Sequence, residues 1–287
     1  MNCQFKKALN YFNLEKLVAG SKSQAAQDLF VVAITNAKQH GSFLEIGGCH
    51  PLASNNTYLL EHELGWHGHS IDIIDSSKTL SIEYTTWSTF YNNIKAEHWP
   101  QSPSNLHELP MEIRQECLEV HGYDRWVGPV VGADQGWSIV RPKTQFHLAD
   151  ALSFDYTTIP NRYDYLQIDI DPPIANLQVL EKIIDTVRAS VITFEHDAWN
   201  GSQESMTTRI QSRRLLQHHG YELLINDVCI HPDWFSKNGI DAPCTKPIAF
   251  EDWWVDPAII SQSIRDCYRW ITSTVFLKTP EQILFLN

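Results

Sequence analysis

Ionisable side chains follow two apolar segments in the second half of the chain. Asp169 and Asp171 stand in QIDIDPP, and Glu195, His196 and Asp197 stand in TFEHDAW. If these segments are neighbouring parallel strands, their ends meet at one edge of a sheet. A carboxylate and an imidazole there could take a proton from a hydroxyl, because the reference pKa of histidine, about 6.5, lies near neutrality. Asp169 and His196 are therefore candidate catalytic residues, although His196 could instead cap a strand end.

The same groups suggest a metal site. Carboxylates on adjacent strand ends suit a hard divalent ion such as Mg²⁺ or Mn²⁺, which would orient acceptor oxygens and acidify a hydroxyl. Asp169, with Glu195 or His196, would supply the ligands. Asp171 comes directly before two prolines and is expected to cap the helix that follows them.

The stretch FLEIGGCHPLASNN, residues 43–56, combines an acid at a strand end with a turn of two glycines. Gly47 and Gly48 lack Cβ atoms, which allows a positive φ and a close ligand, although a tight turn without a ligand would use them too. The third glycine of the dinucleotide pattern GxGxxG is missing. The next strand carries Asp72, which could accept both hydroxyls of a ribose. A ligand with a ribose and an amino acid but no pyrophosphate fits this combination, and S-adenosylmethionine is such a ligand.

Strands and helices alternate along the chain and would position these groups. The predicted strands are residues 42–46, 69–74, 144–149, 163–170, 190–196 and 221–228. The predicted helices are residues 23–40, 52–64, 174–188 and 202–219. This alternation predicts an α/β domain with a parallel sheet and helices on both faces. Ligands of such sheets bind beyond the carboxyl ends of the strands, where the candidate residues lie.

We expect a single domain over residues 1–287, with three segments outside the alternation. Residues 1–22 are interpreted as an N-terminal helical extension. Residues 76–142 are interpreted as an inserted helical or irregular cap, either a lid over the acceptor, an interface, or a cover for the sheet. Its four tryptophans are Trp87, Trp99, Trp126 and Trp137. Residues 229–257, rich in Pro, Asp and Trp, are interpreted as an irregular loop on the acceptor side.

Composition restricts the partners of the protein. Thirty-four acids against 22 bases give a net charge of −12, which opposes contact with nucleic acid or an anionic membrane surface. No stretch approaches the ~18 apolar residues of a membrane helix, and the N-terminal sequence does not resemble a signal peptide. Six scattered cysteines without metal-like spacing predict free thiols. We therefore expect a cytoplasmic protein without nucleic-acid or membrane partners; its oligomeric state is not predicted.

Three segments resemble the FkbM-like family of class I S-adenosylmethionine-dependent methyltransferases. They are SQAAQDLFV, FLEIGGCHPLASNNTYLLEHELGWHGHSIDI and YDYLQIDID. The similarity covers roughly residues 23–72 and 144–228, and the SN-T-LE-LGW-G pattern is its most particular part. The resemblance implies a Rossmann-like class I methyltransferase fold and a methyltransferase activity. It favours O-methylation of a sugar hydroxyl or a glycosylated metabolite, so that the partner would be a small-molecule or carbohydrate acceptor.

The resemblance also assigns cofactor contacts residue by residue. The candidates are Glu45, Gly47, Gly48, Ser54, Asn55, Asp72, Asp150, Ala151 and Asp169. The first three would line the methionine end, and Ser54 and Asn55 would lie at the start of the next helix. Asp72 would hold the ribose hydroxyls, and Asp150 with Ala151 would contact the adenine edge. The last candidate would lie beneath the methionine or the acceptor.

Two other classes of function remain open from the sequence. Asp169-Ile170-Asp171 has the Asp-x-Asp form with which metal-dependent glycosyltransferases hold a nucleotide-sugar diphosphate, but this role leaves the two-glycine turn unexplained. A non-catalytic binding module would keep the fold and lack turnover. Titration with S-adenosylmethionine and with a nucleotide sugar distinguishes the three hypotheses.

Overall fold

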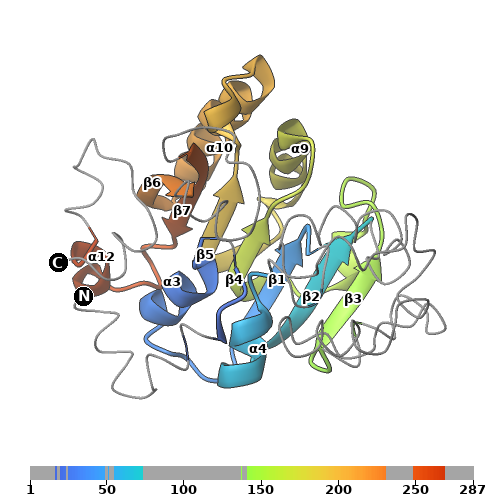
Figure 1. The fold of residues 1–287 in the computed structure, drawn as a ribbon, viewed down its shortest axis with the longest axis vertical. Helices are drawn as coiled ribbons and strands as arrows, with labels where there is room; N and C mark the ends of the chain where they lie inside the picture. Colours follow the sequence, from blue (N-terminus) through green and yellow to red (C-terminus); the bar gives the residue numbers. More distant parts are fainter. Residues whose placement is uncertain are drawn as a thin grey trace, which may run out of the picture.

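A computed structural model describes the central sheet and most of its helices. The described residues are 17, 20–23, 25–48, 51, 55–73, 137, 141–230 and 248–268. Seven strands form one sheet in the order β3-β2-β1-β4-β5-β7-β6 (Figure 1). They are β1 (Ser42–Ile46), β2 (His67–Asp72), β3 (Thr144–Leu148), β4 (Arg162–Ile168), β5 (Arg188–Glu195), β6 (Glu222–Ile230) and β7 (Ile248–Val255). β1 to β5 are parallel, whereas β7 runs antiparallel to β5 and β6, so the sheet is mixed rather than wholly parallel.

Helices cover both faces of the sheet (Figure 1). The α3 helix (Gln27–Ile34) and the α4 helix (Tyr58–Leu64) pack into the core of one face, and α9 (Pro173–Ile183) and α10 (Gln203–His218) pack into that of the other. A short α12 helix (Gln262–Asp266) follows β7, and 3₁₀ turns occupy Tyr156–Thr158 (η4) and Ala198–Asn200 (η5). The order 3-2-1-4-5 is that of a doubly wound sheet. With the antiparallel β7 between β5 and β6, the protein has a Rossmann-like class I methyltransferase fold.

β7 is the element that the sequence pattern does not predict. Its residues, IAFEDWWV, were expected in the irregular loop 229–257. Trp253 packs on the α3 side, where its ring lies 4.2 Å from that of Phe30, and Trp254 packs on the opposite side. Both tryptophans are fully buried. A strand buried on both faces loses the alternation of polar and apolar residues by which strands are recognised.

Most of the predicted extensions lie outside the described residues. These include Trp87, Trp99 and Trp126 and nearly all of segments 1–22 and 76–142. Trp137 is described, and it is buried: it stacks on Phe146 with ring centroids 4.5 Å apart. Trp137 therefore packs against β3.

Two further expectations from composition can be compared with the structure. Cys229 is a buried thiol that forms no disulfide, but Cys267 is disulfide-bonded, so the expectation of six free cysteines is wrong at that position. Among the described residues, no helix is long and apolar enough to cross a membrane.

Candidate functional site

The turn after β1 needs its two glycines because other parts of the chain lie against them. Gly47 has a φ of +88°, and a Cβ there would lie 1.6 Å from the carbonyl oxygen of Asp169. A Cβ on Gly48 would lie 2.1 Å from Oγ of Ser70. Internal packing thus explains both glycines, and it brings the β1 turn directly against the end of β4. Any ligand at this turn also lies beside Asp169.

Glu45 faces the interior beneath this turn. It is 1% exposed, and its carboxylate accepts hydrogen bonds from Asn55 Nδ2 at 3.1 Å, Thr57 Oγ1 at 3.1 Å and Ser70 Oγ at 3.0 Å. Burial raises the pKa of Glu45, while the nearby Arg141 opposes that rise. The carboxylate therefore holds the segment before α4 in place and does not line a surface, contrary to its predicted cofactor contact.

Arg141 completes this buried network, and sequence reasoning missed it. The side chain is fully buried, with Nε 2.7 Å from Glu61 Oε2, Nη1 2.6 Å from Asn55 Oδ1 and Nη2 2.7 Å from Thr57 Oγ1. Asn55 thus has both ends of its amide engaged inside the protein and acts as a structural residue. Ser54, predicted beside it, lies outside the described residues.

The carboxyl ends of β2 and β3 combine an acid with exposed apolar side chains. Asp72 ends β2 and is 8% exposed, and its carbonyl accepts a hydrogen bond from Ala149 N. Two apolar side chains next to it are unusually exposed for their type: Ile73, which follows it in the chain, at 64%, and Leu148, its partner on β3, at 49%. An acid flanked by open apolar surface suits a nucleoside, with the ribose hydroxyls on the carboxylate and the base on the aliphatic groups.

The predicted adenine contacts take unequal positions. Asp150 is exposed, but its Oδ1 accepts a hydrogen bond from Leu152 N at 2.9 Å and so stabilises its own turn. Ala151 is 3% exposed and packs in the core beside η4. Leu152, which the sequence did not single out, offers the open surface of this loop.

Asp169 and Glu195 form a pair at the ends of β4 and β5. Their carboxyl groups are close enough for each to affect the pKa of the other. Burial raises the pKa of Asp169 to about 6, and burial together with Asp169 raises that of Glu195 well above its usual value. Asp169 is therefore the acid of the pair that ionises first as the pH rises. Glu251, buried and opposite Glu195 on β7, adds a further acid with a raised pKa.

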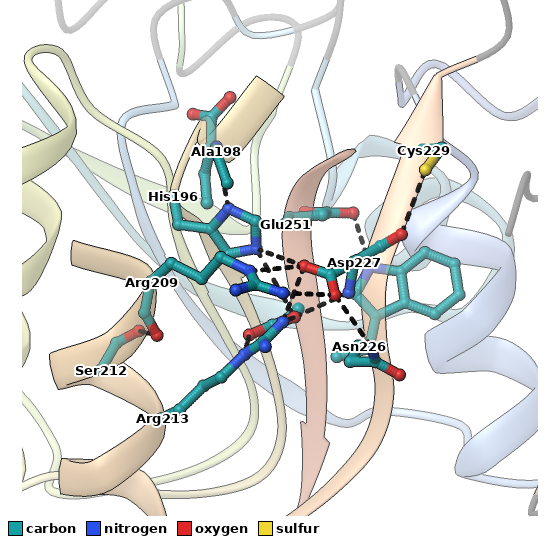
Figure 2. A network of polar contacts seen from close by, with 12 residues as sticks. His196, Ala198, Arg209, Ser212, Arg213, Asn226, Asp227, Cys229 and Glu251 are labelled. Carbon is teal, nitrogen blue, oxygen red and sulfur yellow. Dashed lines mark hydrogen bonds and ion pairs between the residues drawn. The ribbon is translucent and has the colours of Figure 1, made fainter. Parts of the chain in front are cut away.

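His196 does not join this pair. It follows Glu195 directly, so its side chain points to the opposite face of the sheet. The ring is fully buried: Nδ1 accepts a hydrogen bond from Ala198 N at 3.1 Å, and Nε2 lies 3.5 Å from Asp252 Oδ1 and 3.8 Å from Asp227 Oδ1 (Figure 2). This placement contradicts both predicted roles of His196, as a base beside Asp169 and as a metal ligand with Asp169 and Glu195.

The group around His196 has ligand types that a metal could use. Atoms of His196, Asp227 and Asp252 all lie within 4.8 Å of one another. Two arginines of α10 already neutralise the carboxylates: Arg213 makes two bonds of 2.7 Å to Asp252, and Arg209 makes two of 2.7 Å to Asp227 (Figure 2). Bidentate pairs of this kind fill the oxygens that a cation would need. The group is an ion-pair network that ties α10 to β5, β6 and β7.

Comparisons with known proteins find only distant likenesses. No family model matches the chain, and no curated protein does. Solved structures that resemble it include a TehB-like SAM-dependent methyltransferase from Corynebacterium glutamicum, with a TM-score of 0.38 and 10% identity over 84% of this chain and 93% of that one. An rRNA methylase from Streptococcus thermophilus has a TM-score of 0.35 and 10% identity, covering 78% and 91%. The [4+2]-cyclase SpnF has a TM-score of 0.40 and 12% identity, covering 88% and 95%. At these values the likenesses assign neither an activity nor a substrate.

Proposed function

We propose that the protein is an S-adenosylmethionine-dependent methyltransferase that binds its cofactor across the carboxyl ends of β1, β2 and β3. The observation that carries this proposal is Asp72, which lies next to the exposed side chains of Ile73 and Leu148. In a doubly wound sheet, ligands bind beyond the carboxyl ends of the strands, where Asp72 lies. The apolar side chains fit an adenine ring, and Asp72 fits the two ribose hydroxyls next to it.

The methionine end of the cofactor would lie over the β1 turn, beside Asp169. Because Gly47 packs on the backbone of Asp169, the two strand ends leave no side chain between them. S-adenosylmethionine supplies an activated methyl group on a positively charged sulfonium. An ionised carboxylate close to that charge favours the cofactor over its neutral demethylated product through Coulomb attraction.

The acceptor is proposed to be a hydroxyl, with the Asp169–Glu195 pair taking its proton. Methyl transfer to a hydroxyl needs alignment and removal of one proton. Asp169, with its pKa raised to about 6, is ionised at neutral pH yet more basic than an ordinary aspartate. It therefore replaces His196 as the candidate base. A sugar acceptor, suggested by the family resemblance, stays a prediction because residues 231–247 lie outside the described part.

A divalent metal gains no support at the Asp169–Glu195 pair, because among the described residues these two carboxyl groups belong to no group of three possible ligands. In the described part of the chain, the one group of three possible ligands is that of His196, which lies on the other face. The Asp-x-Asp glycosyltransferase hypothesis, which requires a metal at Asp169 and Asp171, therefore gains no support.

Calorimetric titration tests the cofactor site. The wild-type protein should bind S-adenosylmethionine saturably and should release no heat with a nucleotide sugar. Asp72→Asn should weaken binding about tenfold to hundredfold, the effect of losing charge-assisted hydrogen bonds to two hydroxyls. Asp185→Asn is the matched control. The side chain of Asp185 is 82% exposed, and this residue comes just before β5, near the amino ends of the strands. Equal affinity in all three proteins would remove Asp72 from the site, and the absence of binding by the wild type would overturn the proposal.

A further inference from the structure

A cavity lies at the amino ends of the parallel strands, at the opposite end of the strands from the proposed cofactor site. Its volume is about 420 Å³, within the range of small-molecule pockets. The first residues of four parallel strands line it: Ser42 of β1, His67 of β2, Thr144 of β3 and Arg162 of β4. Because β1 to β4 run in the same direction, these amino ends are separated from the carboxyl ends by the length of the strands (Figure 1).

The charge of this cavity is opposite to that of the whole protein. The chain carries a net charge of −12, yet the described residues that line the cavity include Lys143 and Arg162 and no Asp or Glu. Two acids lie beside the cavity, and each is paired with a cation outside its lining: Asp164 accepts a bond from Lys38 Nζ at 2.6 Å, and Glu61 accepts one from Arg141 Nε at 2.7 Å. Neither Lys143 Nζ nor the Arg162 guanidinium forms an ion pair with any described residue. Two unpaired cations beside one cavity favour an anion.

Neutral polar groups form the inner wall of the cavity. His69 Nδ1 lies 2.9 Å from His147 Nε2, and burial lowers the pKa of both rings, that of His69 to about 4. The pair is therefore uncharged at neutral pH and offers hydrogen bonds rather than charge. Tyr163 also lines the cavity, is 5% exposed, and its buried hydroxyl has no hydrogen-bond partner. A buried hydroxyl without a partner is rare in folded proteins, and a polar ligand with a small shift of the ring would satisfy it.

We propose that this cavity binds a small phosphate monoester through Lys143 and Arg162. A phosphate dianion matches the two cations, and a guanidinium holds phosphate oxygens in a bidentate manner. Ser42 and His69 line the same space and provide neutral hydrogen-bonding groups for the rest of the ligand. The site is independent of the proposed methyl transfer, since no residue assigned to the cofactor lines it.

Phosphorus NMR and calorimetry with inorganic phosphate test this site in the full-length protein. Wild type should bind phosphate with a dissociation constant of about 1 mM or tighter. Lys143→Met and Arg162→Gln should each weaken binding about tenfold, the loss expected for a charge-assisted bond. Arg214→Gln is the matched control, because Arg214 is exposed on α10 and does not line the cavity.

A second measurement places the ligand without relying on variants. Phosphate should shift the ring resonances of His67 and His69 in the wild-type protein, while the affinity for S-adenosylmethionine stays the same. Absence of phosphate binding, equal affinity in Lys143→Met and Arg214→Gln, or unchanged histidine resonances would each overturn the proposal. None of these results would bear on the cofactor site at the opposite end of the strands.

Discussion

Glu195 and His196 are neighbours in the chain, but they belong to two acidic clusters of opposite character. On the α3 side, Glu195 pairs with Asp169, and no cation lies against either carboxyl group among the described residues. On the α10 side, His196 lies beside Asp252, whose carboxylate is held by Arg213 in a bidentate pair. Burial raises the pKa values of the acids in both clusters. In the first cluster nothing cancels that rise, whereas in the second the neighbouring His196 and Arg213 hold the pKa of Asp252 below its usual range.

The difference separates structural acids from acids available for chemistry. A buried carboxylate that is neutralised by arginine contributes to the fold and cannot take a proton near neutral pH. A buried carboxylate without a cation weakens the fold and keeps a proton affinity that catalysis can use. We therefore expect changes on the α10 side to alter stability, and changes on the α3 side to alter binding, activity and pH dependence.

The largest effect should follow from removing a cation. Arg213→Met leaves the buried carboxylate of Asp252 with no arginine, and only the imidazole of His196 and the backbone N–H of Asp227 stay beside it among the described residues. The free energy of unfolding at neutral pH should fall by about 3–5 kcal/mol, the cost of breaking a buried ion pair. Urea denaturation measures this change. Arg214→Met, the exposed neighbour, should stay within about 0.5 kcal/mol of wild type. A similar small change in Arg213→Met would show that the network is not structural.

An intermediate effect should appear in the pH dependence of stability. Asp169 ionises near pH 3.8 when unfolded and at about pH 6 when folded. Between these values the folded state binds more protons, so the wild-type protein loses stability as the pH rises through this window. Asp169→Asn removes this loss, and its stability relative to wild type should rise by about 1–3 kcal/mol from pH 4 to pH 7.

The sign of this effect is what distinguishes the two clusters. The lowered pKa of Asp252 gives the opposite dependence: its stabilisation is present above the unfolded pKa and is lost as the pH falls through the folded value. Denaturation curves of Asp169→Asn that follow the wild type at every pH would contradict the assignment of a raised pKa to the pair.

The sequence predicted the positions of most elements better than the direction of side chains. β1 has its predicted bounds, and β2 to β6 begin or end within two residues of theirs. The alternation of polar and apolar residues along β5 could not show to which face of the sheet each side chain points, because Thr193 and Phe194 are both buried. Glu195 and His196 were therefore assigned to one site, whereas they lie on opposite faces. Arg141 gave no local signal, since its partner Glu61 lies 80 residues earlier in the chain.

The smallest effect should come from an exposed charge near the pair. Asp171 is exposed and raises the pKa of Asp169, and Asp197, which is more buried, does so more strongly. Asp171→Asn should lower the pKa of Asp169 by less than about one unit, because solvent screens the exposed charge. Carbon NMR of the side-chain carboxyl groups measures this shift. A larger shift from Asp171→Asn than from Asp197→Asn would mean that burial does not set the strength of these interactions.

The central claim is that the uncompensated Asp169–Glu195 pair lies against the sulfonium of a bound cofactor. It is tested most directly by the ratio of affinities for S-adenosylmethionine and for S-adenosylhomocysteine, which lacks the positive charge, measured across the pH range. If Asp169 ionises beside the sulfonium, wild-type protein should increasingly prefer S-adenosylmethionine as the pH rises through about 6, and Asp169→Asn should show a flat ratio. A ratio that does not change with pH in the wild-type protein would contradict the claim.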